Sequence, residues 1–136
     1  PSGSLMKACF SGKYTQAEVG KMINGNGGFN AYVGSNDMRD LMKMIADGNE
    51  TAKAVVDAFH YQLCKEIGAM SVVLGGKVDQ IILTGGIAYN AKTQEDIKAA
   101  VEWIAPVTIY PGEDELLALA QGALRVVTGE EEAMVY

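Results

Sequence analysis

Two short β-branched runs, each ending in a glycine turn, constrain the fold of this 136-residue chain more than any other feature. The runs cover 78–84 and 107–110, and helical spacing of apolar residues fills 93–104 between them and 113–127 after them. Strands that alternate with helices are typical of a parallel sheet with right-handed crossovers. We therefore predict an α/β fold in which the second half of the chain runs strand, helix, strand, helix.

The first 76 residues are predicted to be mostly helical. Thr15 and Glu18 have the spacing of a capping box, which predicts a helix from there to Ile23. Apolar residues recur every three or four positions over 52–74, so we expect a helix of about seven turns that serves as a central packing element. Gly75-Gly76 ends this helix and marks the change to the strand-helix pattern.

The small number of strands bears on the domain organisation. Two parallel strands form a poor sheet by themselves, because the outer edge of each is left unpaired. The chain is either a small, unusual α/β domain or one part of a larger domain, and the open edges favour the second. We predict that residues 1–136 are one portion of a domain, with 1–76 mostly helical and 77–136 forming the strand-helix-strand-helix part.

Composition limits the classes of partner and the compartment. The net charge of −6 disfavours nucleic acid and anionic membrane surfaces. No apolar run approaches the ~20 residues that span a bilayer, and no secretory leader is visible, so we expect a cytoplasmic protein. Cys9 and Cys64 lack the paired spacing of a zinc site or a disulfide framework, which favours reduced, buried thiols.

A double glycine follows the first predicted strand, at the edge of an α/β sheet where ligands bind. Gly85 and Gly86 lack a Cβ, so their backbone amides can approach a flat or anionic ligand. Asn90 could bond that ligand or cap the next helix. The alternative is an ordinary strand-to-helix turn with positive φ, and spacing alone favours the turn by about two to one.

An acidic segment follows the second predicted strand. Glu113, Asp114 and Glu115 supply three carboxylates that could hold Mg²⁺ directly or through waters. The alternative is that these acids only complement the positive end of the helix dipole, and taken alone this simpler interpretation is preferred.

Asp37 and Arg39 lie at the predicted start of a further helix, which Ser35 or Asn36 can cap. An aspartate and an arginine that flank an apolar residue could clamp a ribose and a base. By spacing alone, a helix start with an exposed Arg39–Asp40 pair is the stronger interpretation.

The chain offers no recognisable catalytic set. His60 is the single histidine, and it lies beside the apolar stripe of the long helix, where a packed or surface histidine is expected. No Ser-His-Asp or Cys-His arrangement can be assembled, and no Gly-x-x-x-x-Gly-Lys phosphate loop is present.

Four ordered blocks, taken together, resemble the acetate/butyrate kinase family within the actin-like ATPase superfamily, and butyrate kinases most closely. The blocks are Cys9-Phe10-Ser11-Gly12-Lys13-Tyr14, Asn36-Asp37-Met38-Arg39, Ile82-Leu83-Thr84-Gly85-Gly86-Ile87-Ala88-Tyr89, and 104–107 with 110–116. The resemblance covers almost the whole chain and implies the C-terminal, nucleotide-side portion of such a kinase.

The resemblance implies an actin-like core of two ribonuclease-H-like halves with the nucleotide bound between them. It also implies the transfer of phosphate from ATP to butyrate or a similar short-chain carboxylate, which gives an acyl phosphate and ADP. ATP or ADP with Mg²⁺ would be the cofactors, the carboxylate would bind through the half that this chain lacks, and a homo-oligomer is expected.

The resemblance also implies roles for individual residues. Asp37, Met38 and Arg39 match the turn that contacts the nucleotide, and Thr84, Gly85, Gly86, Ile87, Ala88 and Asn90 match the loop that wraps the adenosine. Asp114 falls where the family places a magnesium-linked glutamate, with Glu113 and Glu115 as rival candidates.

The residues with which the family transfers phosphate have no match here. The phosphate-binding loop, the catalytic acid and the transition-state histidine are unmatched, and Pro1 stands where the family has an arginine. We therefore expect no catalytic residue in this chain and no activity from the chain alone. The alternatives are a non-catalytic packing or oligomerisation module, or part of another kinase of the superfamily such as a sugar kinase.

Overall fold

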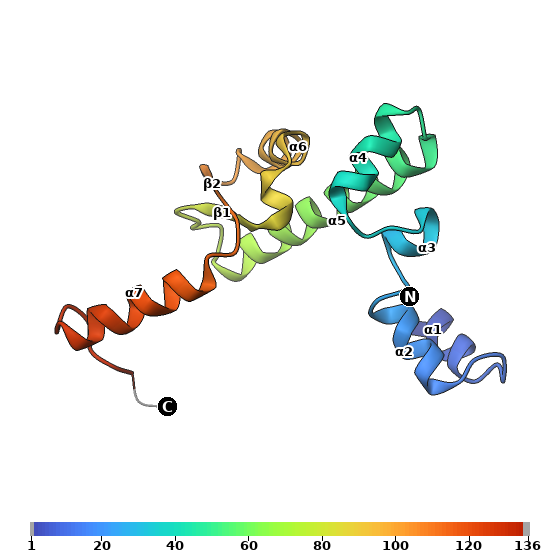
Figure 1. The fold of residues 1–136 in the computed structure, drawn as a ribbon, viewed down its shortest axis with the longest axis horizontal. Coiled ribbons are helices and arrows are strands. Elements are labelled where there is room, and N and C mark those ends of the chain that lie inside the picture. The colour runs from blue at the N-terminus through green and yellow to red at the C-terminus, as the bar shows by residue number, and fades with distance from the viewer. Residues whose placement is uncertain (1, 135–136) are drawn as a thin grey trace. The chain divides into compact units, whose positions relative to one another are not determined.

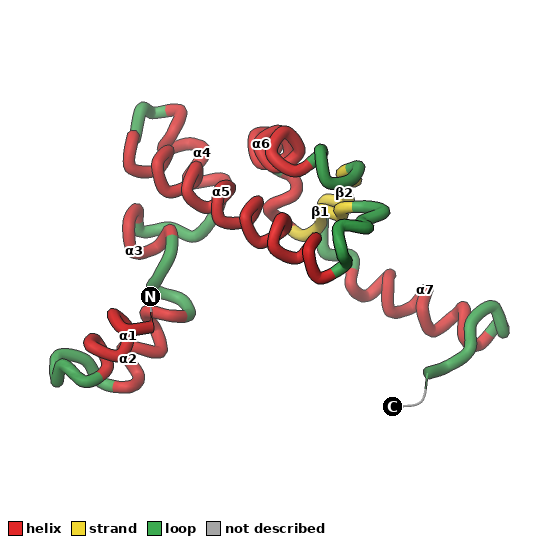
Figure 2. The backbone as a smooth tube through the Cα atoms, turned by 180° about the vertical axis from the view of Figure 1, so that it is seen from behind, coloured by secondary structure: helices red, strands yellow, loops and turns green. Residues whose placement is uncertain are grey.

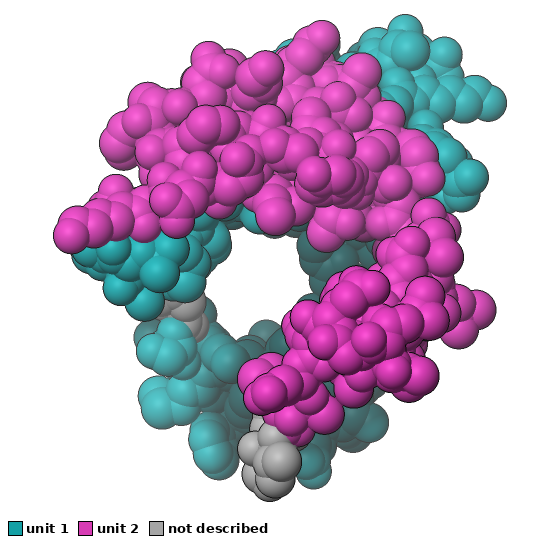
Figure 3. Space-filling view, turned by 90° about the vertical axis from the view of Figure 1, so that its left-hand side faces the viewer, with its two compact units in different colours: residues 1–75 teal, residues 76–136 magenta. Residues whose placement is uncertain are grey.

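The computed structural model describes residues 2–134, so Pro1 and its expected place in the family pattern lie outside the described residues. The chain divides into two compact units, residues 1–75 and residues 76–136, which Figure 3 colours separately. Each unit is described below by itself.

In the described part of the first unit, the regular elements are all helices, joined by loops (Figure 1). Its elements are α1 (Ser2–Cys9), α2 (Gln16–Ile23), α3 (Phe29–Val33), α4 (Met38–Ala46) and α5 (Glu50–Val73). The predicted capping box is confirmed, because the Glu18 amide donates to Thr15 Oγ1 at 3.3 Å and the Thr15 amide donates to Glu18 Oε2 at 2.7 Å. The long helix ends at Val73, and Leu74 separates it from the predicted glycine pair Gly75-Gly76.

The core of the first unit lies where α4 and the start of α5 meet. Met38, Leu41 and Val56 are buried together, and the Phe29 and Phe59 rings pack against them with centroids 5.2 Å apart. Met70 in the second half of α5 is exposed, and so is Leu74, which follows the helix. Within the first unit, α3 and α4 pack on α5, so the expectation of a central packing element is confirmed for the half of α5 that contributes to this core.

The second unit contains a parallel two-stranded sheet and its helices (Figure 2). Its elements are β1 (Ile81–Gly85), the 3₁₀ turn η1 (Gly86–Tyr89), α6 (Ala91–Val101), β2 (Val107–Pro111) and α7 (Glu115–Val127). The register pairs Ile81 with Val107 and continues to Gly85 and Pro111. The first strand begins three residues later than expected, because Pro106 precedes β2 and the earlier residues have no strand to pair with.

The α/β expectation is confirmed by the crossover between the strands. Ile97 and Val101 of α6 are buried, as the helical spacing predicts. The burial of β1 alternates along the strand, and Ile82 is exposed. In the described part of the chain only these two strands pair, so each keeps one edge open.

The last helix has no buried residue among its 13 positions. Its apolar stripe is open to solvent, and Leu116 is 85% exposed. A stripe of this kind normally faces a packing partner, and no element of the second unit provides one.

Two further expectations concern the surface. No disulfide joins the two cysteines, but Cys9 is exposed and Cys64 is half-buried, so the expectation of buried thiols is wrong for Cys9. None of the helices that the structure describes has both the length and the apolar character needed to cross a membrane.

Candidate functional site

The carboxyl ends of the two strands are joined by two glycines. The Gly85 amide donates to the Gly112 carbonyl at 3.1 Å, and the Gly112 amide donates to the Gly85 carbonyl at 3.2 Å. Both residues have positive φ, 86° at Gly85 and 112° at Gly112, which only glycine adopts readily. The predicted positive-φ turn therefore exists, and it also fixes the distance between the two strand ends.

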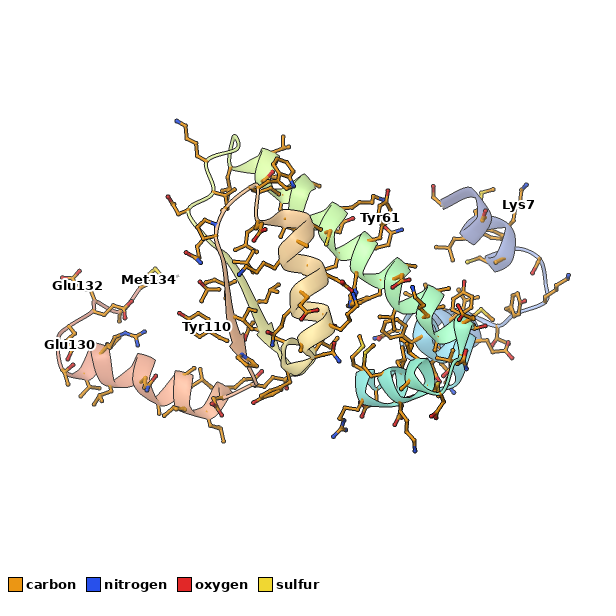
Figure 4. The ribbon with its side chains drawn as sticks, turned by 90° about the horizontal axis from the view of Figure 1, so that it is seen from above. Lys7, Tyr61, Tyr110, Glu130, Glu132 and Met134 are labelled. Atoms are coloured by element: carbon orange, nitrogen blue, oxygen red, sulfur yellow. The ribbon has the colours of Figure 1, made fainter. Side chains whose placement is uncertain are left out.

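A cavity of about 350 Å³ opens beside this glycine pair. Its lining combines the two groups predicted from the sequence, with Thr84 and Gly85 from the first strand end and residues 113–115 from the second. Tyr110 adds an aromatic wall, and Figure 4 draws it on the side of β2 away from α6. The structure thus brings the glycine bend and the acidic segment to one place. The sequence predicted this only through the direction of the strands, whose carboxyl ends lie at one edge of the sheet.

The glycine bend offers exposed main chain to the cavity. A Cβ placed on Gly85 would lie 3.9 Å from Glu113 Oε1, and one on Gly86 would lie 4.0 Å from the same atom, with nothing else near. Among the described residues, the Glu113 carboxylate is therefore the one side-chain group that comes close to the bend. Gly86 has an ordinary φ, so the absence of a side chain there is not required by backbone geometry.

Asn90 follows the bend and caps α6. Its Oδ1 accepts from the Thr93 amide at 2.8 Å and from Thr93 Oγ1 at 3.0 Å. Of the two possibilities for Asn90, a ligand contact or a helix cap, the oxygen makes the cap. The Nδ2 group is the part of the side chain that a ligand could use. The helix begins at Ala91, two residues before the expected start at 93.

Two other residues of the bend differ in their availability. Ala88 is buried, and its carbonyl accepts from Gln94 Nε2 at 2.7 Å, so neither group faces outward. Ile87 is 40% exposed and can contact a ligand with its side chain.

The acidic segment does not form a metal cage by itself. Among the described residues, no group of three or more His, Cys, Asp or Glu side chains is placed to share one ion. Mg²⁺ prefers one or two carboxylates completed by waters and substrate phosphates, and carboxylates at an open strand end fit that preference. Asp114 occupies the cap position of α7 without capping it, whereas Glu113 is the acid that reaches the bend.

Asp37 and Arg39 form a bidentate ion pair in the first unit. Arg39 Nε donates to Asp37 Oδ1 at 3.0 Å, and Arg39 Nη2 donates to Asp37 Oδ2 at 2.5 Å. Asp37 Oδ1 also caps α4 by accepting from the Arg39 amide at 2.8 Å, so Ser35 and Asn36 are not the caps. The side-chain and backbone hydrogen bonds from Arg39 lower the pKa of Asp37 to about 2.

The three residues of this turn present different groups to solvent. The Arg39 side chain is 90% exposed, so its guanidinium is oriented by Asp37 and still accessible. The Met38 side chain is 7% exposed and belongs to the core with Leu41. Only the backbone of Met38 remains for a ligand.

The sequence did not reveal two features of the structure. An apolar cavity of about 560 Å³ lies between α3 and α5, lined in part by Phe29, Val55 and Phe59. The phenol of Tyr89 reaches Gly112, a contact signalled only by the glycine that follows Pro111.

Comparison with known proteins identifies the family. The sequence model described as the acetokinase family matches residues 10–134. The chain belongs to this family. It is 54% identical over 136 residues to butyrate kinase 2 of Clostridium acetobutylicum, an alignment that covers all of this chain and 38% of that protein. The predicted membership of a carboxylate kinase family is confirmed.

Two solved structures of the acetokinase type share the fold. Porphyromonas gingivalis acetate kinase matches with a TM-score of 0.77 and 22% identity over 89% of this chain and 37% of its own. A propionate kinase from Francisella tularensis subsp. tularensis SCHU S4 matches with a TM-score of 0.69 and 22% identity, over 85% of this chain and 35% of its own. The predicted α/β, actin-like ATPase fold is confirmed. The chain spans 38% of the length of the curated relatives that it matches.

Proposed function

We propose that this acetokinase-family chain is the C-terminal, nucleotide-side portion of an enzyme that transfers phosphate from ATP to butyrate or a similar short-chain acid. The products would be an acyl phosphate and ADP. The observation that carries the proposal is the glycine bend, of which Gly85 lines a cavity at the carboxyl ends of two parallel strands and Gly86 lies next along the chain, outside that lining. The proposed location is the cytoplasm, and a homo-oligomer is the proposed assembly.

The residues around the bend divide the work of binding. The adenosine would lie against Gly85 and Gly86, with Thr84 and Ile87 beside it and Asn90 Nδ2 as a donor. In the first unit, taken by itself, the Arg39 guanidinium is held by Asp37 and offers N–H groups that suit ribose or phosphate oxygens. Magnesium linked to the phosphates would be held through the acidic segment and would supply charge neutralisation during transfer.

The chemistry of the cavity supports binding without catalysis. Its lining side chains include three acids and no lysine or arginine. Phosphoryl transfer needs positive charge placed around the moving group. The cationic side chains would therefore come from a segment that corresponds to the part of its relatives that this chain does not match. We expect the 136-residue chain to bind nucleotide weakly and to form no acyl phosphate.

The decisive experiment is a calorimetric titration of the chain with ADP and Mg²⁺, repeated on Gly86→Val. Gly86 has ordinary φ and open space, so valine would obstruct the ligand and not the fold, and we expect roughly tenfold weaker binding. Gly68→Val is the matched control, since a Cβ at this position in α5 has nothing within 4 Å, whereas one at Gly86 meets only Glu113 Oε1 at 4.0 Å. Equal affinity of Gly86→Val and the unaltered chain would refute the assigned bend.

The acceptor is tested on the product of the complete gene. Acyl phosphate formation is measured with acetate, butyrate, isobutyrate and a hexose, and we expect butyrate to be the best of the four. Preference for the hexose would favour the alternative of a sugar kinase of the same superfamily.

A non-catalytic module is the second candidate, and the open edges of β1 and β2 favour it. In that case the chain would form a dimer that does not depend on nucleotide and would bind no ADP. Light scattering with and without ADP separates this candidate from the first.

A further inference from the structure

The side chain of Tyr89 spans the gap between the two predicted parts of the site. Tyr89 is the last residue of η1, and its side chain ends beside Gly112, which directly follows the neighbouring strand β2. A Cβ placed on Gly112 would lie 2.8 Å from the Tyr89 hydroxyl, 3.5 Å from Cζ and 3.8 Å from Cε2. The end of the phenol therefore lies against the backbone at Gly112, where a methyl group would require the ring to shift.

Burial does not explain this arrangement. Tyr89 is 68% exposed, so most of its ring remains in water and contributes little to the core. Its neighbour Ala88 is buried and carries the packing of this turn. The position of the Tyr89 ring instead gives a contact with the backbone at Gly112.

That backbone residue directs the acidic segment. Gly112 immediately precedes Glu113, and it is bound to Gly85 by the reciprocal pair of backbone hydrogen bonds. A long side-chain hydrogen bond, from Thr84 Oγ1 to the Gly112 carbonyl at 3.5 Å, also reaches it. The Tyr89 phenol is a second side-chain contact at the residue where the chain leaves β2 toward the acids.

We infer that Tyr89 is a positioning residue that sets the acidic segment relative to the glycine bend, and so couples magnesium binding to nucleotide binding. The inference rests on the proposed function. Tyr89 acts at Gly112, which the paired backbone hydrogen bonds hold to Gly85, so its loss should move the carboxylates that follow Gly112 more than the main chain on which the adenosine lies.

The first test compares ADP binding by the 136-residue chain with EDTA and with saturating Mg²⁺. For Tyr89→Ala we expect an affinity in EDTA within about twofold of the unaltered chain and a gain from Mg²⁺ reduced by roughly fivefold or more. Tyr89→Phe keeps the ring and should retain most of the gain. Tyr61→Ala is the control, because Tyr61 is 66% exposed on α5 and should change neither value.

The outcomes of this titration separate the two claims. An unchanged Mg²⁺ gain in Tyr89→Ala overturns the inference, and so does an equal loss with and without Mg²⁺, which would make Tyr89 a direct contact of the adenosine. If the unaltered chain binds no ADP at all, the proposed function fails and the coupling to magnesium fails with it.

A second test addresses the contact without any ligand. Gly112→Ala should lower the midpoint of urea unfolding, because a methyl group meets the Tyr89 hydroxyl and the backbone has positive φ. In the Tyr89→Ala background only the backbone strain remains, so the midpoint shift should be clearly smaller. Equal shifts in both backgrounds would show that the phenol does not press on residue 112 and would overturn the positioning role.

Discussion

The two polar ends of the Asn90 side chain have different tasks in the proposed site. Asn90→Asp keeps an oxygen for the Thr93 amide but replaces the Nδ2 donor, so the free energy of unfolding should stay within about 0.5 kcal/mol while ADP affinity falls roughly tenfold. Asn90→Ala removes the cap and should cost about 1 kcal/mol. Urea unfolding and calorimetry measure the two effects, and full ADP affinity in Asn90→Asp would exclude Nδ2 from the site.

The ion pair of Asp37 and Arg39 predicts a dependence of stability on pH. The pKa of Asp37 is lowered from 3.8 to about 2, so its contribution is complete above pH 3.8 and is lost as the pH falls toward 2. Asp37→Asn keeps a cap for α4 but loses the ion pair. The stability advantage of the unaltered chain over Asp37→Asn should therefore shrink between pH 3.8 and 2. A difference that stays constant across this range would contradict the assignment.

At the scale of elements, the packing of α4 on α5 carries the stability of the first unit. Leu41 is fully buried at this contact, so Leu41→Ala should lower the free energy of unfolding by about 2–5 kcal/mol. Met70→Ala, on the exposed second half of α5, should change it by less than about 0.5 kcal/mol. Urea unfolding of the two variants tests the contrast, and similar losses would mean that the whole of α5 is packed.

Element types could be predicted from the sequence because their signals are local. The 24-residue α5 begins after Asn49 and ends before Gly75, and both signals lie within one turn of the helix. The burial of α5 could not be predicted, since it depends on which element faces each turn. The start of β1 could not be predicted locally either, because β1 begins at Ile81, which pairs with Val107, the first residue after Pro106.

The candidate site was predictable to the same extent. The direction of the strands places Gly85 and the acidic segment at one edge, and this follows from the sequence. The contact of Tyr89 with Gly112 depends on strand register and on a side-chain rotamer, neither of which the sequence pattern contains.

At the scale of the whole molecule, α7 exposes leucines that no described element of the second unit covers. Replacing Leu116, Leu119 and Leu124 together with glutamine should change the free energy of unfolding by no more than about 0.5 kcal/mol per site, because these side chains are already in water. The same change should lower self-association and the binding of a hydrophobic dye. Light scattering and dye fluorescence measure this, and a large loss of stability would show that α7 packs within the chain.

The sheet of two parallel strands has a further consequence for how copies of the chain can meet. Its two free borders lie on opposite strands, so one molecule can recruit a neighbour on each side. Head-to-tail contacts of this kind do not end in a closed ring unless the rotation between copies allows it. Pairing through one border gives a dimer, whereas pairing through both would grow as a filament. The length of such a filament would rise with concentration, and adding pre-formed filament ends would speed its growth.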